Sequence, residues 1–436
     1  TNRPKVLHKL AGQSMLKHVA ETALALGGEG VHVVVGHKAE QIRHLHADLA
    51  VNWVEQEQQM GTGHAVMQAM PFIPDDAKVV ILSGDVPLTQ LDTLRALSAV
   101  DAQMVLLVAK VANPYGLGRI LRDANGQIVR IIEEKDATDE QRKIQEIYTG
   151  ICCVNASDLK KWLPQLSTNN ASGEYYLTKI IEFATQESKK IASIEPQNLF
   201  EIQGVNTLSQ LNQLERDWQY FLAQKLMEEG VQLADATRID IRGQLECASD
   251  VVIDVNVVFE GQVSIGADSE IGPNCVIKNS VIGQNVVIKS NSVLENVVIE
   301  EHCEVGPFAR LRPGTHLSKH CKIGNFVETK NTSFDEHSKA MHLSYLGDAK
   351  IGKHVNIGCG TITCNYDGVH KHQTIIQDHA FIGSDTQLVA PVVVGEGATI
   401  GAGTTLRDDA PEQALTLTPS RQRSILGWKR KTKENS

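Results

Sequence analysis

From about residue 250 onward, aliphatic side chains recur at intervals of six residues. Glycine often follows the aliphatic residue, as in Ile265-Gly266 and Ile382-Gly383. A hexapeptide repeat is typical of a left-handed parallel β-helix, in which one aliphatic side chain per face points into a triangular core. The repeat therefore predicts this all-β fold for the second half of the chain. The positions expected in the core are Ile253, Phe259, Ile265, Ile271, Ile277, Ile282, Ile288, Leu294, Ile299, Val305, Leu311, Leu317, Ile323, Ile376, Ile382, Leu388, Val394, Ile400 and Leu406.

The repeat is interrupted twice, at about residues 331–346 and 363–374. We expect each interruption to be a loop that leaves the β-helix. Loops held by a rigid scaffold often carry binding and catalytic residues, so these two segments are the first places to search for chemistry.

Residues 1 to about 206 follow a different pattern, in which short apolar strands alternate with amphipathic helices. Buried β-branched runs separated by helices are typical of a mostly parallel sheet covered on both faces. Asp123-Ala124-Asn125-Gly126 is a good hairpin turn, so some antiparallel pairing is expected too. The first half is predicted to be α/β and Rossmann-like. Strands are expected at 31–35, 51–54, 79–82, 120–122 and 128–132, and helices at 39–49 and 63–70.

The length of 436 residues exceeds what one hydrophobic core normally supports, which favours two domains. Between the two patterns, Leu208, Leu211 and Leu214 begin a helical spacing, and Gly230 follows as an expected C-cap. The expected organisation is an α/β domain over 1–207, a linker helix over 208–229, and a β-helix domain with a C-terminal tail over 230–436.

Composition limits the partners. The formal net charge of −10 argues against binding to nucleic acid or to an anionic membrane surface. No segment has the apolar length of a membrane-spanning helix. The 8 cysteines show no framework spacing, which favours reduced packing residues and a cytoplasmic protein.

Several polar residues of the first half stand where phosphate chemistry needs them. Asp85 follows a predicted strand, where an α/β sheet binds ligands and a carboxylate can hold a metal on a nucleotide phosphate. Gln56 and the Gly61-Thr62 turn before a helix suit hydrogen bonds to a base edge or a phosphate. Lys5 could supply a cation to a triphosphate. Taken singly, each has a simpler explanation: an Asp after a strand is more often a helix cap or a turn residue.

In this order, however, the motifs resemble those of the sugar-phosphate nucleotidyltransferases. The matching segments are Pro4-Lys5-Val6-Leu7, Gln56, Gly61-Thr62-Gly63-His64-Ala65, Gly84-Asp85-Val86-Pro87-Leu88, Gly116-Leu117-Gly118-Arg119-Ile120, Ile132-Glu133-Glu134-Lys135-Asp136, Gly173-Glu174-Tyr175-Tyr176-Leu177-Thr178 and Gly204-Val205-Asn206. With the β-helix attached, nearly the whole chain resembles the bacterial bifunctional enzymes that combine N-acetylglucosamine-1-phosphate uridylyltransferase with glucosamine-1-phosphate N-acetyltransferase activity.

The resemblance implies a role for each matching residue of the first half. It places Mg²⁺ on Asp85 and Asn206, and it pairs Lys5 with phosphate oxygens. The implied nucleotide- and sugar-binding set is Lys5, Gln56, Gly61, Thr62, Ser83, Asp85, Gly118, Glu133, Tyr148 and Asn206. Gln56, Gly61 and Thr62 would contact the uracil. Gly118 and Glu133 would contact the N-acetylglucosamine.

Two departures from the family pattern stand out. The family's glycine-rich loop with its catalytic arginine belongs just upstream of Pro4-Lys5 and falls outside this sequence. Tyr148 stands before Thr149-Gly150 where the family has Asn. A tyrosine keeps a hydrogen-bonding group but changes the shape of the expected sugar pocket.

In the second half, His342 lies in the first interruption of the repeat. Acyl transfer from a thioester to an amine needs a base, and a neutral imidazole suits that work. The resemblance makes His342 this base, with Glu328 as the residue that orients it. The implied acetyl-acceptor set is Arg312, Lys330, Tyr345 and Asn356, and the implied acetyl-CoA set is Cys359, Asn365, Tyr366, Ser384 and Ala402. Arg421 or Arg423 would replace a family arginine near the CoA phosphates, because the matching position is Pro419.

The resemblance implies a sequence of two reactions in a homotrimer formed through the β-helix. Glucosamine-1-phosphate would first be acetylated by acetyl-CoA, and the product would then react with UTP to give UDP-N-acetylglucosamine and pyrophosphate. Two alternatives stay open: a nucleotidyltransferase whose β-helix is only regulatory, and a non-enzymatic scaffold whose β-helix only forms trimers.

Overall fold

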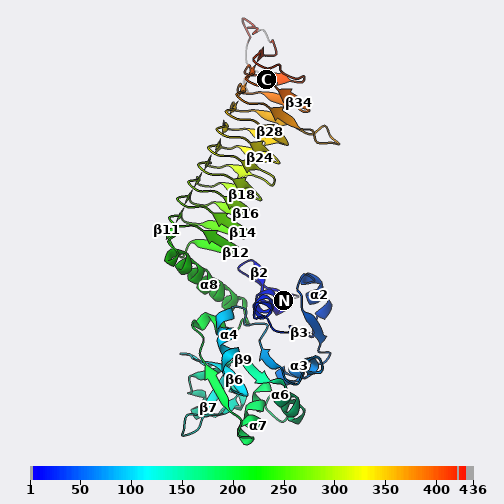
Figure 1. The fold of residues 1–436 in the computed structure, drawn as a ribbon, viewed down its shortest axis with the longest axis vertical. Helices are drawn as coiled ribbons and strands as arrows, with labels where there is room; N and C mark the ends of the chain where they lie inside the picture. The colour runs from blue at the N-terminus through cyan, green and yellow to red at the C-terminus, as the bar shows by residue number, and fades with distance from the viewer. Residues whose placement is uncertain (1–2, 420–421, 429–436) are drawn as a thin grey trace. The chain divides into compact units, whose positions relative to one another are not determined.

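The computed structural model describes residues 3–419 and 422–428. It divides into two compact units, Thr1–Trp218 and Gln219–Ser436. The first unit is α/β and the second is a solenoid of short parallel strands (Figure 1). The observed boundary lies within helix α8 (Leu208–Glu228), which supplies residues to both units.

The main sheet of the first unit is mixed. Its strands are β10 (Ile191–Ile194), β6 (Met104–Lys110), β9 (Glu146–Asn155), β7 (Gly118–Arg122) and β8 (Ile128–Ile132) in this order, with β5 (Lys78–Ile81) also paired to β9. Among the hydrogen-bonded neighbours of this sheet, only the β10–β6 pair is parallel; β9 runs antiparallel to β5, β6 and β7, and β7 runs antiparallel to β8. The prediction of a mostly parallel sheet was therefore wrong, because buried apolar runs do not encode strand direction. The 120–132 hairpin is confirmed as β7–β8.

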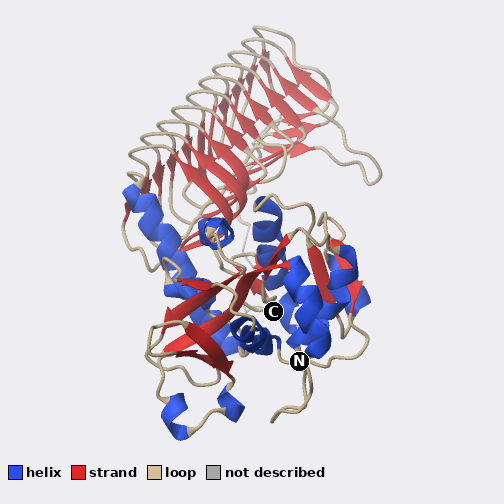
Figure 2. Ribbon diagram, turned by 60° about the horizontal axis from the view of Figure 1, so that its bottom comes forward, coloured by secondary structure: helices blue, strands red, loops and turns tan. Residues whose placement is uncertain are grey.

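Helices cover both faces of this sheet (Figure 2). Met104 and Leu106 of β6 pack with Trp162, whereas Leu107 of the same strand packs with Leu94 on the other side. The helices of this unit are α1 (Met15–Ala25), α2 (Ala39–Leu45), α3 (Thr62–Ala69), α4 (Leu91–Ala99), α5 (Asp139–Arg142), α6 (Ala156–Trp162) and α7 (Ile180–Gln186). Strands β3 (His32–Val35) and β4 (Asn52–Glu55) form a separate parallel pair, and β1 (Lys9–Leu10) and β2 (Gln13–Ser14) an antiparallel one.

The second unit is the predicted parallel β-helix. The strands of its 11-stranded sheet are β11 (Gln232–Leu233), β13 (Val252–Ile253), β15 (Glu270–Ile271), β17 (Val287–Ile288), β20 (Glu304–Val305), β23 (Lys322–Asn325), β26 (Lys339–His342), β29 (Asn356–Ile357), β32 (Phe381–Ile382), β35 (Thr399–Ile400) and β37 (Leu415–Thr416). The 16-stranded sheet contains β12 (Ile239–Cys247), β14 (Val257–Ile265), β16 (Val276–Ile282), β18 (Val293–Glu295), β19 (Val298–Ile299), β21 (Arg310–Leu311), β22 (His316–Leu317), β24 (Glu328–Lys330), β25 (Ser333–Phe334), β27 (Tyr345–Gly347), β28 (Ala349–Ile351), β30 (Ile362–Cys364), β31 (Thr374–Ile376), β33 (Gln387–Val389), β34 (Val392–Val394) and β36 (Thr405–Leu406).

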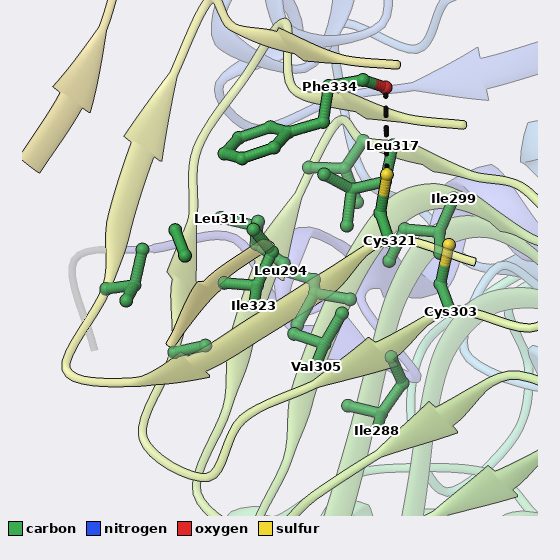
Figure 3. Packing of buried hydrophobic residues seen from close by; sticks show 14 of the residues in the cluster. Ile288, Leu294, Ile299, Cys303, Val305, Leu311, Leu317, Cys321, Ile323 and Phe334 are labelled. Carbon is green, nitrogen blue, oxygen red and sulfur yellow. Dashed lines mark hydrogen bonds between the residues drawn. The ribbon is translucent and has the colours of Figure 1, made fainter. Parts of the chain in front are cut away.

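All the aliphatic positions expected in the β-helix core are buried. Figure 3 shows several of them stacked from coil to coil, with Cys303 and Cys321 filling further interior positions. Because the six-residue period brings every such side chain inside, the sequence predicted this core correctly.

One of the two predicted loops is absent. Residues 331–346 continue the regular coils as β25, β26 and part of β27, with Phe334, Ala340 and Leu346 fully buried in the core. The expectation of a loop was wrong here, because Phe and Ala can occupy the interior position and they hid the period. The second interruption is confirmed: the chain leaves the coil between β30 and β31, and Tyr366 bridges Lys371 across the projecting loop (Figure 1).

A corner of the β-helix carries a ladder of histidines. The members are His302, His320, His337, His354 and His379, all with left-handed φ between 55° and 62°. Their rings stack with centroids 4.7 to 5.1 Å apart. This spacing matches the distance of about 4.8 Å between neighbouring strands. We refer to these five residues as the histidine ladder.

Helix α8 contributes to both hydrophobic cores. Leu214 packs with Leu10 and Met15 of the first unit, whereas Ala223 and Leu226 belong to the β-helix core. Gly230 has a φ of 95°, as expected for a residue that ends a helix. Among residues 3–419 and 422–428, none of the helices combines the length and apolarity needed to cross a membrane.

Candidate active sites

Three of the predicted nucleotide-site residues meet at one point. The Nζ atom of Lys5 lies 2.7 Å from Oδ2 of Asp85 and 2.9 Å from Oδ1 of Asn206. The chain is arranged to bring them together, since the backbone N–H of Val205 donates to the carbonyl of Asp85. The result is a carboxylate oxygen and an amide oxygen converging beside a lysine, although the three residues are far apart in sequence.

The oxygen atoms of this cluster fit a magnesium ion. Mg²⁺ prefers oxygen ligands and is usually held by one or two carboxylates together with substrate phosphates. Asp85 and Asn206 offer such a partial set. Within the described residues, no group of three or more His, Cys, Asp and Glu side chains forms a complete metal cage.

The residues expected to contact the uracil lie in the turn before α3. The Nε2 atom of Gln56 donates to the carbonyl of Gly61 at 3.3 Å and contacts Nδ1 of His64 at 2.9 Å. Gly61 has a φ of 103°, and a Cβ there would lie 2.8 Å from the carbonyl oxygen of Tyr175. Thr62 Oγ1 accepts a hydrogen bond from the backbone of Leu177. This turn is therefore tightly held against the 175–177 segment.

Gly118, Glu133 and Tyr148 form a second cluster, on strands β7 to β9. Gly118 is the register partner of Tyr148, and a Cβ on Gly118 would lie 3.7 Å from Oε2 of Glu133. Thr178 donates to Oε1 of Glu133 at 2.9 Å. Burial raises the pKa of the Glu133 carboxyl, and burial also raises the pKa of the Tyr148 phenol. Ser83 lies close by in the chain fold, because a Cβ on Gly150 would be 2.9 Å from its Oγ.

In the β-helix, predicted residues share one corner position on successive coils. Ile323, Ala340, Ile357, Ile382 and Ile400 are successive register partners, and the second residue after each forms a column. We name this set the corner column; its members are Asn325, His342, Cys359, Ser384 and Ala402. The predicted base and three predicted acetyl-CoA positions thus stack in a line.

The face that adjoins the corner column contains β24, β27 and β30. A cluster of cations lies at the end of this face that is farther from the corner column. Arg312 donates to Glu328 at 2.8 Å, and contact with the Lys371 ammonium lowers the pKa of Lys330. Tyr345 lies between the two ends, as the register partner of Glu328. A three-residue strand such as β27 spans about 10 Å, so the cations and His342 are separated by roughly the length of a sugar phosphate.

The projecting loop joins this cluster. Asn365 Nδ2 donates to Asp348 at 2.5 Å, and the hydroxyl of Tyr366 donates to the carbonyl of Gly368 at 2.6 Å. Asp367 accepts hydrogen bonds from the backbone of His370 and from His372, and these lower its pKa to about 2. Asn356 lies on β29, in the same sheet as β26, where it is the register partner of Lys339. Arg421 lies outside the described residues, and Arg423 is exposed.

The structure places three further residues in these clusters that the sequence did not single out. Thr178 contacts Glu133, Lys371 contacts Lys330, and Asn325 contacts His342. Thr178 belongs to the matching segment 173–178, although no role was given to it, whereas Asn325 and Lys371 only lie near recognised motifs. Asn325 and Lys371 become neighbours of their partners only when the coils are stacked in the correct register.

Comparisons with known proteins agree with the two-unit architecture. The MobA-like NTP transferase domain family matches residues 1–141, the GMPPB C-terminal domain family matches residues 241–332, and the bacterial transferase hexapeptide family matches residues 373–408 with six repeats. Among curated relatives, the bifunctional protein GlmU of Legionella pneumophila (strain Lens) is 58% identical over 99% of this chain and 95% of its own length. GlmU of Marinobacter nauticus is 54% identical with the same coverages, and that of Azoarcus sp. is 51% identical over 99% of this chain and 96% of its own length.

Proposed function

Since this chain belongs to the family of the bifunctional protein GlmU, whose members are uridylyltransferases and acetyltransferases, we propose which residues perform each reaction and on which substrates. The first unit binds UTP and N-acetylglucosamine-1-phosphate with Mg²⁺. The β-helix binds glucosamine-1-phosphate and acetyl-CoA. The observation that carries the first assignment is the convergence of Lys5, Asp85 and Asn206; the second rests on the corner column.

In the uridylyl transfer, a phosphate oxygen of N-acetylglucosamine-1-phosphate attacks the α-phosphorus of UTP and pyrophosphate leaves. The substrate is itself the nucleophile, so the protein needs only to position and to stabilise charge. Asp85 and Asn206 would hold Mg²⁺, which would supply positive charge to the phosphate oxygens. Lys5 then turns from Asp85 to the phosphates. Gln56, Gly61 and Thr62 bind the base. Gly118, Glu133 and Tyr148 bind the sugar, with Ser83 near Gly150 beside them.

In the acetyl transfer, the amine of glucosamine-1-phosphate attacks the thioester carbonyl of acetyl-CoA. His342 accepts the amine proton, and the thiolate of CoA leaves and is protonated. Arg312, Lys330 and Lys371 bind the sugar phosphate at the cationic end of the face. Tyr345 and Asn356 line the sugar. Cys359, Ser384 and Ala402 follow the CoA chain along the corner column, with Asn365 and Tyr366 beside it.

Two single substitutions separate the reactions. In Asp85→Asn, loss of the metal-binding carboxylate is expected to lower pyrophosphate release about 100- to 1,000-fold, while release of free thiol continues. In His342→Ala, loss of the base is expected to lower thiol release from glucosamine-1-phosphate and acetyl-CoA by about 10² to 10⁴, while pyrophosphate release from added N-acetylglucosamine-1-phosphate and UTP continues. Each variant is the control for the other. Unchanged thiol release in His342→Ala would remove the acetyl-transfer assignment, and equal loss of both products in either variant would indicate misfolding.

We further propose that the protein is a cytoplasmic homotrimer joined through its β-helices. Exposed apolar side chains on the β-helix, including Val281 and Val298 on neighbouring strands, support packing of a second copy. All the cysteines are free thiols, which supports a reducing compartment. Sedimentation equilibrium that finds only monomer would contradict the trimer, and recovery of the protein outside the cytoplasmic fraction would contradict the location. The negative net charge supports the absence of nucleic-acid and membrane partners.

A further inference from the structure

The imidazole of His342 is hydrogen-bonded to a side chain on the preceding coil of the β-helix. Its Nδ1 atom lies 3.1 Å from Oδ1 of Asn325. The two residues are direct register partners on β23 and β26. The pairing of these two strands reaches further toward the corner than the pairing of their neighbours, which covers two residues on each strand. The contact is therefore set by the backbone ladder and not by a flexible loop.

The backbones approach closely at this corner. A Cβ on Gly324 would lie 1.9 Å from the carbonyl oxygen of Met341, so only glycine permits the observed approach. This glycine precedes Asn325, and Met341 precedes His342. Both side chains consequently leave adjacent, rigid backbone positions.

Glu328, which the sequence suggested as the orienting residue, has a different partner. Its Oε1 accepts a hydrogen bond from Arg312 at 2.8 Å. In the corner column Cys359 follows His342 on the next coil, and Tyr345 and Glu328 are paired with each other on the adjoining face. Among these residues, Asn325 is the one whose side chain is hydrogen-bonded to the imidazole.

We propose that Asn325 is a positioning residue for the acetyl-transfer reaction. Its amide oxygen accepts the Nδ1–H of His342, which fixes the tautomer in which Nε2 carries the lone pair and faces the amine. In the other tautomer Nε2 would bear a proton and could not act as a base. This inference rests on the proposed role of His342 as the base.

The test compares three variants at two sites, with thiol release measured between pH 5.5 and 9. Asn325→Leu removes the acceptor and is expected to lower kcat for acetyl transfer by about 10- to 100-fold, a part of what a general base contributes. Asn325→Asp keeps an acceptor and is expected to recover most of this loss. Because a carboxylate stabilises the protonated imidazole, the acidic limb of its pH profile is expected to move to higher pH. Ser290→Ala changes the same corner position two coils earlier and is expected to leave the profile unchanged.

The outcomes separate this inference from the proposed function. Far-ultraviolet circular dichroism reports whether the β-helix of each variant is folded, and pyrophosphate release from UTP and N-acetylglucosamine-1-phosphate reports whether the first unit is intact. If His342→Ala retains thiol release, the base assignment itself fails. If His342→Ala loses thiol release but Asn325→Leu and Asn325→Asp keep both the rate and the pH profile of the unsubstituted protein, Asn325 does not position the base. A rate loss in Asn325→Leu that Asn325→Asp does not recover, with no displaced limb, would also overturn the inference.

Discussion

At the scale of single residues, the cluster of Gly118, Glu133 and Tyr148 contains a carboxyl group whose ionisation is unfavourable. Glu133 is partly buried beside Gly118 and Tyr148, and its carboxylate accepts a hydrogen bond from the Thr178 hydroxyl. Burial makes ionisation of its carboxyl unfavourable, which is why its pKa is raised. The ionised carboxylate therefore destabilises the fold, and only the proposed contact with a sugar would give this charge a role.

This cost predicts that Glu133→Gln stabilises the first unit at neutral pH. The folded state holds the proton of Glu133 more tightly than the unfolded chain does. The free energy of unfolding therefore falls as pH rises from the unfolded-state pKa to the higher folded-state pKa, and it stays lower at higher pH. Removing the charge should therefore raise Tm at pH 7 by about 1 to 3 °C, with a smaller gain near pH 4. Calorimetry at both pH values measures this, with Glu140→Gln, at a side chain that is 84% exposed, as the control. An equal gain at both pH values would contradict the electrostatic explanation.

Residue by residue, the sequence located much of the candidate chemistry but few of the contacts. Lys5, Asp85 and Asn206 were predicted as one site, and the structure brings their side chains together. The pairing of Asn325 with His342 could not be predicted, because it depends on how many residues each coil contains. Repeat spacing gives that number only where the aliphatic residues are easy to recognise.

At the scale of structural elements, the β-helix shows where pattern reasoning is strong and where it fails. The core positions followed the six-residue period, and every predicted one is buried. The segment 331–346 was misassigned because Phe334 and Ala340 replace aliphatic residues of intermediate size. Phe334 and Ala340 occupy interior positions on successive faces, so a large and a small side chain keep the core filled while the aliphatic pattern is lost. Strand direction in the first unit also lay beyond the sequence, since it depends on tertiary pairing.

The buried position of Phe334 predicts a large cost of truncation. Phe334→Ala removes a fully buried ring between stacked coils and should lower the free energy of unfolding of the β-helix by about 3 to 5 kcal/mol. Urea denaturation followed by circular dichroism measures the change in midpoint. Val369→Ala, at a side chain 77% exposed in the projecting loop, should change the free energy of unfolding by less than about 0.5 kcal/mol. Similar midpoints for Phe334→Ala and the unsubstituted protein would mean that residues 331–346 do leave the coil.

At the scale of the whole molecule, the chain consists of two folded units that share one helix. Each unit has its own hydrophobic core, and α8 supplies Leu214 to one and Leu226 to the other. The candidate residues of each reaction lie within a single unit. The two reactions should therefore need no residue in common.

This separation predicts that two inactive proteins complement each other. A mixture of Asp85→Asn and His342→Ala, each lacking one reaction, should convert glucosamine-1-phosphate, acetyl-CoA and UTP into UDP-N-acetylglucosamine. Product should appear after a lag, because the acetylated intermediate must accumulate in solution before the second protein binds it. Pyrophosphate release followed over time measures both the lag and the final rate. Adding N-acetylglucosamine-1-phosphate at the start should abolish the lag, and a mixture that forms no product would contradict independent sites.

The stacked rings of the histidine ladder should give proton NMR signals that report on the contact between neighbouring coils. In a stack with ring centroids 4.7 to 5.1 Å apart, each inner imidazole lies within the ring currents of its neighbours on both faces, whereas His302 and His379 have one histidine neighbour each. The aromatic proton resonances of His320, His337 and His354 should therefore be displaced upfield relative to those of the two end members. Any event that separates one coil from the next would return a particular pair of resonances toward free-histidine values. Proton NMR could in this way locate an opening along the solenoid to a single pair of coils, without an added label.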